Sequence, residues 1–264
     1  MHPYASVPGV AKFPPLYAAF KGFAFFLSNP RLWVVPLLAS ALLAVLTLAA
    51  ATGSVMFLWP SSDVGVWSYI LKAMLALGAG AGVLLLCWTI VLPAAFGLVF
   101  EGLVKGVYKL VCSPVAEEKI VASLGSTLRV LLSTLGWRIL WPVVGILTSF
   151  IFGPLGLVVS AFGFGHIASI DAFDLALAMK GVPGAQRVRF MKSEAGRLFS
   201  AAAGGGVLGA LLSISIVGWV FYYPAMFTGA ALHMAAEMPE PWQQGSTALP
   251  GFAAPQLPQQ GVQR

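Results

Sequence analysis

The sequence predicts an all-α integral membrane protein with two long transmembrane helices and two re-entrant or hemipenetrating helical hairpins. Only 9% of its 264 residues are charged and 59% are hydrophobic, whereas soluble domains carry roughly 25% charged residues. So few charges cannot cover a water-exposed surface. Several uncharged apolar runs are long enough to enter or cross a bilayer. Most Lys and Arg residues gather in three stretches, 1–31, 101–138 and 171–197, as positive-inside topology requires.

Residues 1–31 form an interfacial N-terminal segment rich in proline and phenylalanine. A helix there is expected to end at Asn29-Pro30, because proline disfavours helix in the residue before it. The first transmembrane helix follows over 32–52, a stretch without a charge that is long enough for ~30 Å of hydrocarbon. The alternative is a signal peptide, since three alanines near its end resemble a cleavage site. The preceding region is too long, aromatic and proline-rich for that interpretation.

A polar turn is expected over 53–66, on the outside of the membrane. The second apolar run, 67–100, contains a single lysine near its start, and Pro93 should kink its lower part. This run exceeds one bilayer crossing, so it is expected to project into the cytoplasm. Residues 101–138 have apolar positions at helical spacing, broken at Ser113-Pro114. They indicate two amphipathic helices on the cytoplasmic side.

The run 139–170 is the first predicted hairpin. Its 32 uncharged residues would make one helix of ~48 Å, too long for the membrane. Gly153-Pro154 divides it into arms of ~22 Å each, and neither arm comfortably crosses ~30 Å. Residues 198–236 repeat this pattern and indicate a second hairpin. The helical membrane domain is therefore 32–236, and the Pro/Gln-rich tail 237–264 is predicted to be disordered.

Enzyme motifs are absent from the sequence: there is no phosphate-binding loop, dinucleotide fingerprint, paired-histidine metal motif or nucleophile elbow. We therefore expect no catalytic residue, no cofactor and no metal site. His166 and His233 stand alone in the sequence and are interpreted as structural. The net charge of +6 is explained by topology, so nucleic acid is not an expected partner. Cys87 and Cys112 have no metal-ligand spacing and give no disulfide framework.

Ionisable residues at the edges of the apolar runs are the functional candidates. Glu101, Arg138 and Asp171 are the membrane-edge candidates, although each can equally serve as an interface anchor. Asn29 and Arg31 are the anion-binding candidates, because Arg31 opens the first long span. A helix start has free N–H groups and the positive end of the dipole, and a guanidinium adds a planar fork suited to an oxyanion. A positive-inside anchor would look the same.

A series of short motifs occurs in a fixed order over residues 15–236. They are Phe20-Lys21-Gly22, Asn29-Pro30-Arg31, Pro36-Leu37-Leu38, Pro93-Ala94-Ala95-Phe96-Gly97-Leu98 with Glu101, Asp171, and Pro224 with Gly229-Ala230-Ala231. In this order they resemble the CysZ-type sulfate permeases, which share a domain with the etoposide-induced endoplasmic-reticulum membrane proteins. The resemblance implies two long transmembrane helices, two hemipenetrating hairpins and sulfate uptake for cysteine synthesis. Two features depart from it: Arg31 stands alone where the permeases tend to have an arginine pair after a glycine, and Ala-Phe-Asp follows Asp171 in place of an aromatic-proline pattern.

We therefore expect a multi-pass permease for sulfate or a related oxyanion in the plasma (inner) membrane, with both termini cytoplasmic. Its partners would be the lipid bilayer and a small inorganic anion such as sulfate. A non-transporting membrane scaffold or assembly protein is the alternative, and an intramembrane enzyme has no motif behind it. The small-residue pairs Gly78–Gly82 and Gly205–Gly209 suit a homo-oligomer, but they would serve packing within one chain equally well.

Overall fold

The computed structural model describes residues 11–61, 65–87, 91–116, 120–214 and 216–242. Within these ranges the regular elements are helices and no strand is present. Five of the described helices are long and apolar enough to cross a membrane. The all-α prediction is thus confirmed for the described residues, and these five helices are consistent with the predicted membrane protein.

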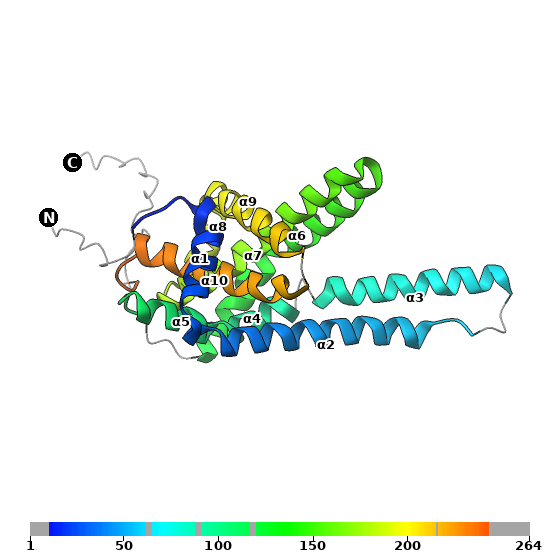
Figure 1. Ribbon diagram of the computed structural model, residues 1–264, viewed down its shortest axis with the longest axis horizontal. Coiled ribbons are helices and arrows are strands. Elements are labelled where there is room, and N and C mark those ends of the chain that lie inside the picture. Colours follow the sequence, from blue (N-terminus) through cyan, green and yellow to red (C-terminus); the bar gives the residue numbers. More distant parts are fainter. Residues whose placement is uncertain (1–10, 62–64, 88–90, 117–119, 215, 243–264) are drawn as a thin grey trace, which may run out of the picture.

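The two helices α2 (Val34–Leu58) and α3 (Val66–Leu86) extend side by side from the rest of the molecule (Figure 1). Large apolar side chains stand exposed along both of them, including Val35 at 65%, Leu46 at 55% and Leu75 at 64% exposure. Water would make such a surface costly, whereas hydrocarbon solvates it. The outer surface of the pair is therefore suited to lipid.

The turn between α2 and α3 is shorter than the expected range 53–66, because α2 continues to Leu58. The hydroxyl of Ser54 donates a hydrogen bond to the backbone oxygen of Ala51 at 2.7 Å. A serine whose hydroxyl is satisfied within its own helix need not end that helix. The polar residues at the start of the expected turn therefore belong to α2.

The second apolar run contains α3 and α4 (Leu92–Val99), with residues 88–90 outside the described part of the chain, and α5 (Glu101–Leu110) follows the run. One face of α5 is buried, while Lys105 and Lys109 on the other face are exposed. The predicted amphipathic helix is thus present at α5. The second one is not separate, because its residues form the start of α6 (Ile120–Phe152), which runs on past Arg138.

The first hairpin turns where Gly153-Pro154 predicts it. Helix α6 ends at Phe152, Gly153 has a φ of +52° that suits glycine, and α7 (Pro154–Met179) begins at the proline. The arms pack closely near the turn, since a Cβ on Gly156 would lie 2.4 Å from the backbone nitrogen of Ser149. The arms have 33 and 26 residues, because each helix continues beyond the uncharged run, so the predicted ~22 Å per arm is too short.

The second hairpin consists of α9 (Ala195–Leu212) and α10 (Ile216–Glu237). Its three consecutive glycines lie inside α9 and not at the turn. A Cβ on Gly204 would stand 1.9 Å from the backbone oxygen of Leu16, and one on Gly206 would stand 2.9 Å from that of Ala161. These glycines therefore allow close contact with neighbouring segments.

Helix α1 (Ala18–Ser28) follows the short η1 (Pro15–Tyr17) and packs against α10. A Cβ on Gly22 would lie 2.1 Å from the oxygen of Ala225, which makes this a backbone-to-backbone contact. Helix α1 ends directly before Asn29-Pro30, as predicted. An interfacial position of the N-terminal segment stays a prediction. Residues 1–10 and most of the predicted disordered tail, 243–264, lie outside the described residues.

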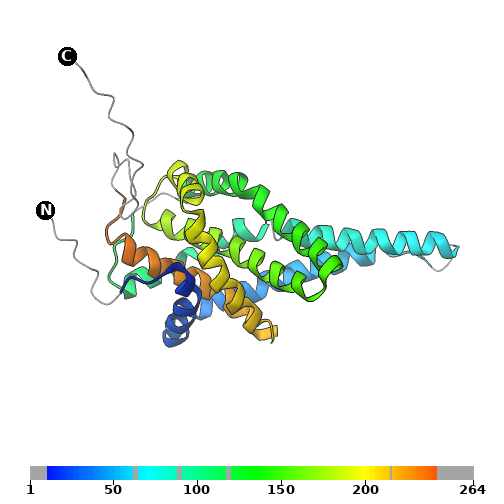
Figure 2. The same ribbon diagram turned by 90° about the horizontal axis from the view of Figure 1, so that it is seen from above.

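The short η2 (Pro30–Leu32) links α1 to α2, and α8 (Gly184–Ser193) links the two hairpins. Figure 2 shows the start of the described chain and the end of α10 at the same end of the molecule, away from the α2–α3 tip. Helices α6, α7, α8 and α9 meet beside the base of the first hairpin. Their meeting point holds the polar groups described next.

Candidate functional site

Two of the predicted membrane-edge residues form a buried ion pair. The guanidinium of Arg138 on α6 faces the carboxylate of Asp171 on α7 with both terminal nitrogens, one of them 3.3 Å from Oδ2. Arg138 Nε also donates to Thr134 Oγ1 at 3.2 Å. The two side chains are only 2% and 9% exposed. Since the charges neutralise each other, both arms of the hairpin continue as helix past them.

A second buried ion pair lies one helical turn further along α7. Asp174 accepts a hydrogen bond from Arg187 of α8 at 2.6 Å, and the side chains are 8% and 1% exposed. Residues three apart on a helix lie on the same side, so Asp171 and Asp174 attach α7 to two different neighbours. Neither Asp174 nor Arg187 was among the residues predicted from the sequence. Asp174 lies three positions after Asp171, and this helical spacing was the available signal for it. The sequence does not show which arginine forms the ion pair with Asp174.

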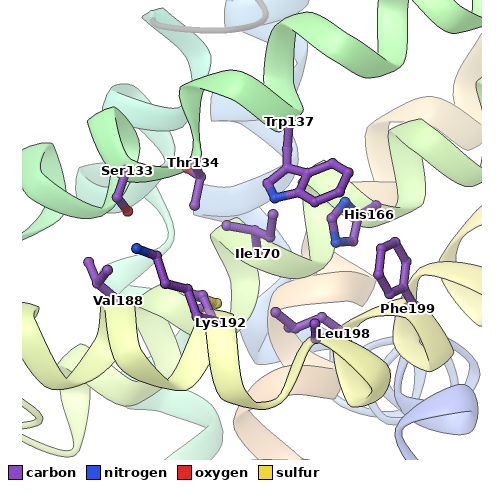
Figure 3. A pocket seen from close by; sticks show the side chains of 11 residues that line it. Ser133, Thr134, Trp137, His166, Ile170, Val188, Lys192, Leu198 and Phe199 are labelled. Atoms are coloured by element: carbon purple, nitrogen blue, oxygen red, sulfur yellow. The ribbon is translucent and has the colours of Figure 1, made fainter.

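A cavity of about 220 Å³ opens beside these ion pairs, between α6, α7, α8 and α9 (Figure 3). Its apolar walls are interrupted by the ammonium of Lys192, the imidazole of His166 and two hydroxyls. No carboxylate lines it among the described residues. The lining residues are Ser133, Thr134, Trp137, His166, Ile170, Val188, Met191, Lys192, Ala195, Leu198 and Phe199.

The polar groups are distributed over the two ends of the cavity. Figure 3 shows the Lys192 chain reaching towards Ser133 at one end, with His166 beside Phe199 at the other and Ile170 between them. Thr134 connects the cavity to the ion pair behind it, because its hydroxyl accepts the hydrogen bond from Arg138. An apolar setting strengthens the attraction between a cation and an anion. The arrangement can therefore hold a small anion.

The remaining predicted residues lie elsewhere, and none of them lines this cavity. The side-chain amide of Asn29 donates to the backbone oxygen of Phe25 at 2.7 Å. Arg31 is exposed in η2. Glu101, in the first turn of α5, forms an ion pair with Lys105 one turn later. The structure thus brings Arg138 and Asp171 together, but not the other three.

His166 and Lys192 are the functional candidates that the sequence analysis missed. His166 was interpreted as structural because no partner stands near it in the sequence. Lys192 belongs to a basic stretch that topology already explained. The lining residues come from four consecutive helices and are spread over positions 133–199, so no local pattern marks the cavity.

A third buried cation, Lys180, lies just after α7 and away from the cavity. Its ammonium donates to Ser113 Oγ at 2.6 Å and to the backbone oxygen of Pro114 at 3.0 Å, and it lies 4.9 Å from the centre of the Tyr108 ring. Burial lowers the pKa of Lys180 from 10.5 to about 8. Its backbone oxygen accepts from Trp242 at 2.7 Å. Lys180 thus fastens the α5–α6 connection and the segment after α10 to the end of α7.

No protein-family model, no curated protein and no solved structure matches this chain. The resemblance to the sulfate permeases therefore rests on the short motifs quoted above. Of the residues in those motifs, Asp171 is the one that lies beside the cavity, through its ion pair with Arg138.

Proposed function

We propose that this chain is a membrane permease for sulfate or a related small oxyanion. The observation that carries the proposal is the polar lining of the cavity between α6 and α9, which offers one ammonium and an imidazole and, among the described residues, no carboxylate. Such a lining attracts an anion and repels none. The order of the sequence motifs, which resembles that of sulfate permeases, supports the same substrate class.

The proposed membrane arrangement has α2 and α3 crossing the bilayer of the plasma (inner) membrane, with both termini cytoplasmic. The hairpins α6–α7 and α9–α10 would enter it without crossing fully. Two observations support this arrangement. The tip of the α6–α7 hairpin stops well short of the α2–α3 tip along the long axis of the molecule (Figure 1). Both flanks of the first hairpin carry basic stretches, which prefer the cytoplasm.

Sulfate uptake into proteoliposomes tests the function. Purified protein should take up sulfate, and Lys192→Gln should reduce uptake roughly tenfold. A contact with a charged group is worth about 1.5–3 kcal/mol, or roughly tenfold to a hundredfold, and Lys192 is itself exposed, so the lower value applies. Arg189→Gln is the matched control, since Arg189 is an exposed cation on the same helix that does not line the cavity.

Arg31 is tested in the same assay as the first contact on the cytoplasmic side. Arg31→Ala should lose oxyanion binding while still inserting in the membrane, and Arg31→Lys should be partly impaired because it keeps the charge but loses the fork. Absence of uptake by the parent protein would overturn the proposed function. Full activity of Lys192→Gln would remove the cavity from the pathway, and full activity of Arg31→Ala would leave Arg31 as a topology anchor.

A non-transporting scaffold is the second candidate, and the α2–α3 pair is the observation that favours it. An added Cβ on Gly78 or Gly82 of α3 would meet no described residue outside its own helix within 4 Å, whereas one on Gly80 would meet Val55 of α2. Two small residues four positions apart let another helix approach closely in lipid, from a second copy or a different protein. Crosslinking of a Gly78→Cys variant in membranes, together with absent sulfate uptake, would favour this function.

A further inference from the structure

The imidazole ring of His166 is fixed on three sides. The indole N–H of Trp141 on α6 donates a hydrogen bond to His166 Nδ1 at 2.9 Å. Phe199 of α9 stacks on the ring, with centroids 4.6 Å apart and planes 9° apart. Trp137 meets it edge-on at 5.6 Å. With 3% of the residue exposed, the ring cannot turn without breaking these contacts.

The hydrogen bond from Trp141 determines where the imidazole proton lies. An indole nitrogen can only donate, so the Nδ1 atom that accepts from it carries no proton. The proton of the neutral ring must then be on Nε2. Among the residues that the structure describes, none accepts a hydrogen bond from Nε2. His166 lines the cavity, so its Nε2–H is a donor available to a ligand there.

The other nitrogen groups at the cavity are donors as well. Lys192 has three N–H groups and no lone pair, and the Trp137 indole donates only. The hydroxyls of Ser133 and Thr134 give their protons to the backbone oxygen of Val130, at 2.8 and 2.9 Å. Thr134 Oγ1 already accepts from Arg138. A ligand with a proton of its own therefore meets few acceptors and no carboxylate among the described lining residues.

We infer that the Trp141–His166 pair makes the cavity selective for a fully deprotonated oxyanion over an oxyanion that carries a proton. The identity of the ligand as an oxyanion rests on the proposed function. A sulfate-like anion offers acceptor oxygens alone and matches the donors. Hydrogen phosphate has the same shape but must bury an O–H, and a buried donor without an acceptor is costly. Trp141 does not line the cavity and acts as a positioning residue.

Replacing Trp141 should change this selectivity in a defined direction. Trp141→Phe keeps an aromatic ring but removes the N–H. His166 Nδ1 can then take the proton, and Nε2 can present its lone pair to the cavity as an acceptor for the O–H of hydrogen phosphate. The preference for sulfate over hydrogen phosphate should therefore become smaller. Trp33→Phe is the matched control, because the Trp33 indole donates to the backbone oxygen of Phe26 at 2.6 Å, outside the cavity lining.

The experiment has two readouts that do not depend on transport. Nitrogen-15 NMR of histidine-labelled protein in detergent, assigned with a His166→Gln variant, reports which ring nitrogen is protonated. Binding of radioactive sulfate, competed by phosphate at mildly alkaline pH, reports selectivity between two dianions that differ by one proton. We expect a proton on Nε2 and a preference for sulfate of about tenfold or more. In Trp141→Phe we expect mixed tautomers and a preference reduced severalfold.

A wild-type His166 protonated on Nδ1 would overturn the inference, as would equal competition by sulfate and phosphate. The inference would also be overturned if Trp141→Phe kept the same preference for sulfate over phosphate as the parent protein. Both wild-type measurements remain decisive if that variant does not fold. The proposed function is tested by a separate assay, sulfate uptake by proteoliposomes, and absence of uptake would refute it. Failure of the proposed function can therefore be distinguished from failure of this inference.

Discussion

Removing one partner of the Arg138–Asp171 ion pair should destabilise the protein strongly. The side chains are 2% and 9% exposed, so Arg138→Met leaves a buried carboxylate without its cation, and Asp171→Leu leaves a buried guanidinium. Breaking a buried pair in this way costs about 3–5 kcal/mol. Replacing both residues removes both charges, so the double variant should recover most of that loss.

The measurement is unfolding of detergent-purified protein by denaturant, followed by circular dichroism, for the parent, both single variants and the double variant. Glu101–Lys105 is the internal control, since its side chains are 22% and 49% exposed and an exposed pair contributes at most about 1 kcal/mol. Losses below about 1 kcal/mol for the Arg138 and Asp171 variants would mean that water solvates the pair. The explanation of why α6 and α7 continue past these charges would then be wrong.

Two further predictions concern Lys180 and the first hairpin. The pKa of Lys180 falls from 10.5 to about 8 on folding. Between these two pH values the unfolded chain binds more protons than the folded chain. The free energy of unfolding should therefore rise with pH across this range, by at most about 3 kcal/mol. The difference in unfolding free energy between the parent and Lys180→Met isolates this rise, and a difference that stays flat with pH would contradict it. With Cys87 and Cys112 replaced, an impermeant maleimide applied from outside should modify Ser61→Cys at the α2–α3 turn. It should not modify Leu155→Cys at the α6–α7 tip if the hairpin enters the bilayer without crossing fully, as proposed; equal labelling would show a full crossing. Leu155 is exposed, whereas a side chain at Gly156 would overlap Ser149.

The elements set by local chemistry were predictable from the sequence. Proline restricts the residue before it, and α1 ends directly before Asn29-Pro30. A glycine-proline step inside a long apolar run predicted the turn between α6 and α7, and the turn is found at Gly153. Overall hydrophobicity predicted the membrane class, since five described helices are apolar and long enough to cross a bilayer.

The features that depend on partners distant in sequence were not predictable. From the sequence, the uncharged run is expected to end at Arg138 and Asp171, because an isolated charge is costly in lipid. Each is 33 positions from the other, so nothing local shows that they neutralise each other within a longer helical pair. The close contacts of Gly204 with Leu16 and of Gly206 with Ala161 were not predictable for the same reason, because both partners are distant in sequence.

The charges around the cavity follow a pattern that the ion pairs explain. Asp171 and Asp174 each hold an arginine, so α7 is joined to α6 and α8 through neutral pairs. Lys192 forms no ion pair with any described residue, and it is the cation that lines the cavity. Since the pairs beside it cancel, this exposed ammonium is the net charge among the described lining residues, and it makes the potential at the cavity positive. A positive space lined by N–H donors favours a small anion over a cation or a neutral solute, which is the physical basis of the proposed function.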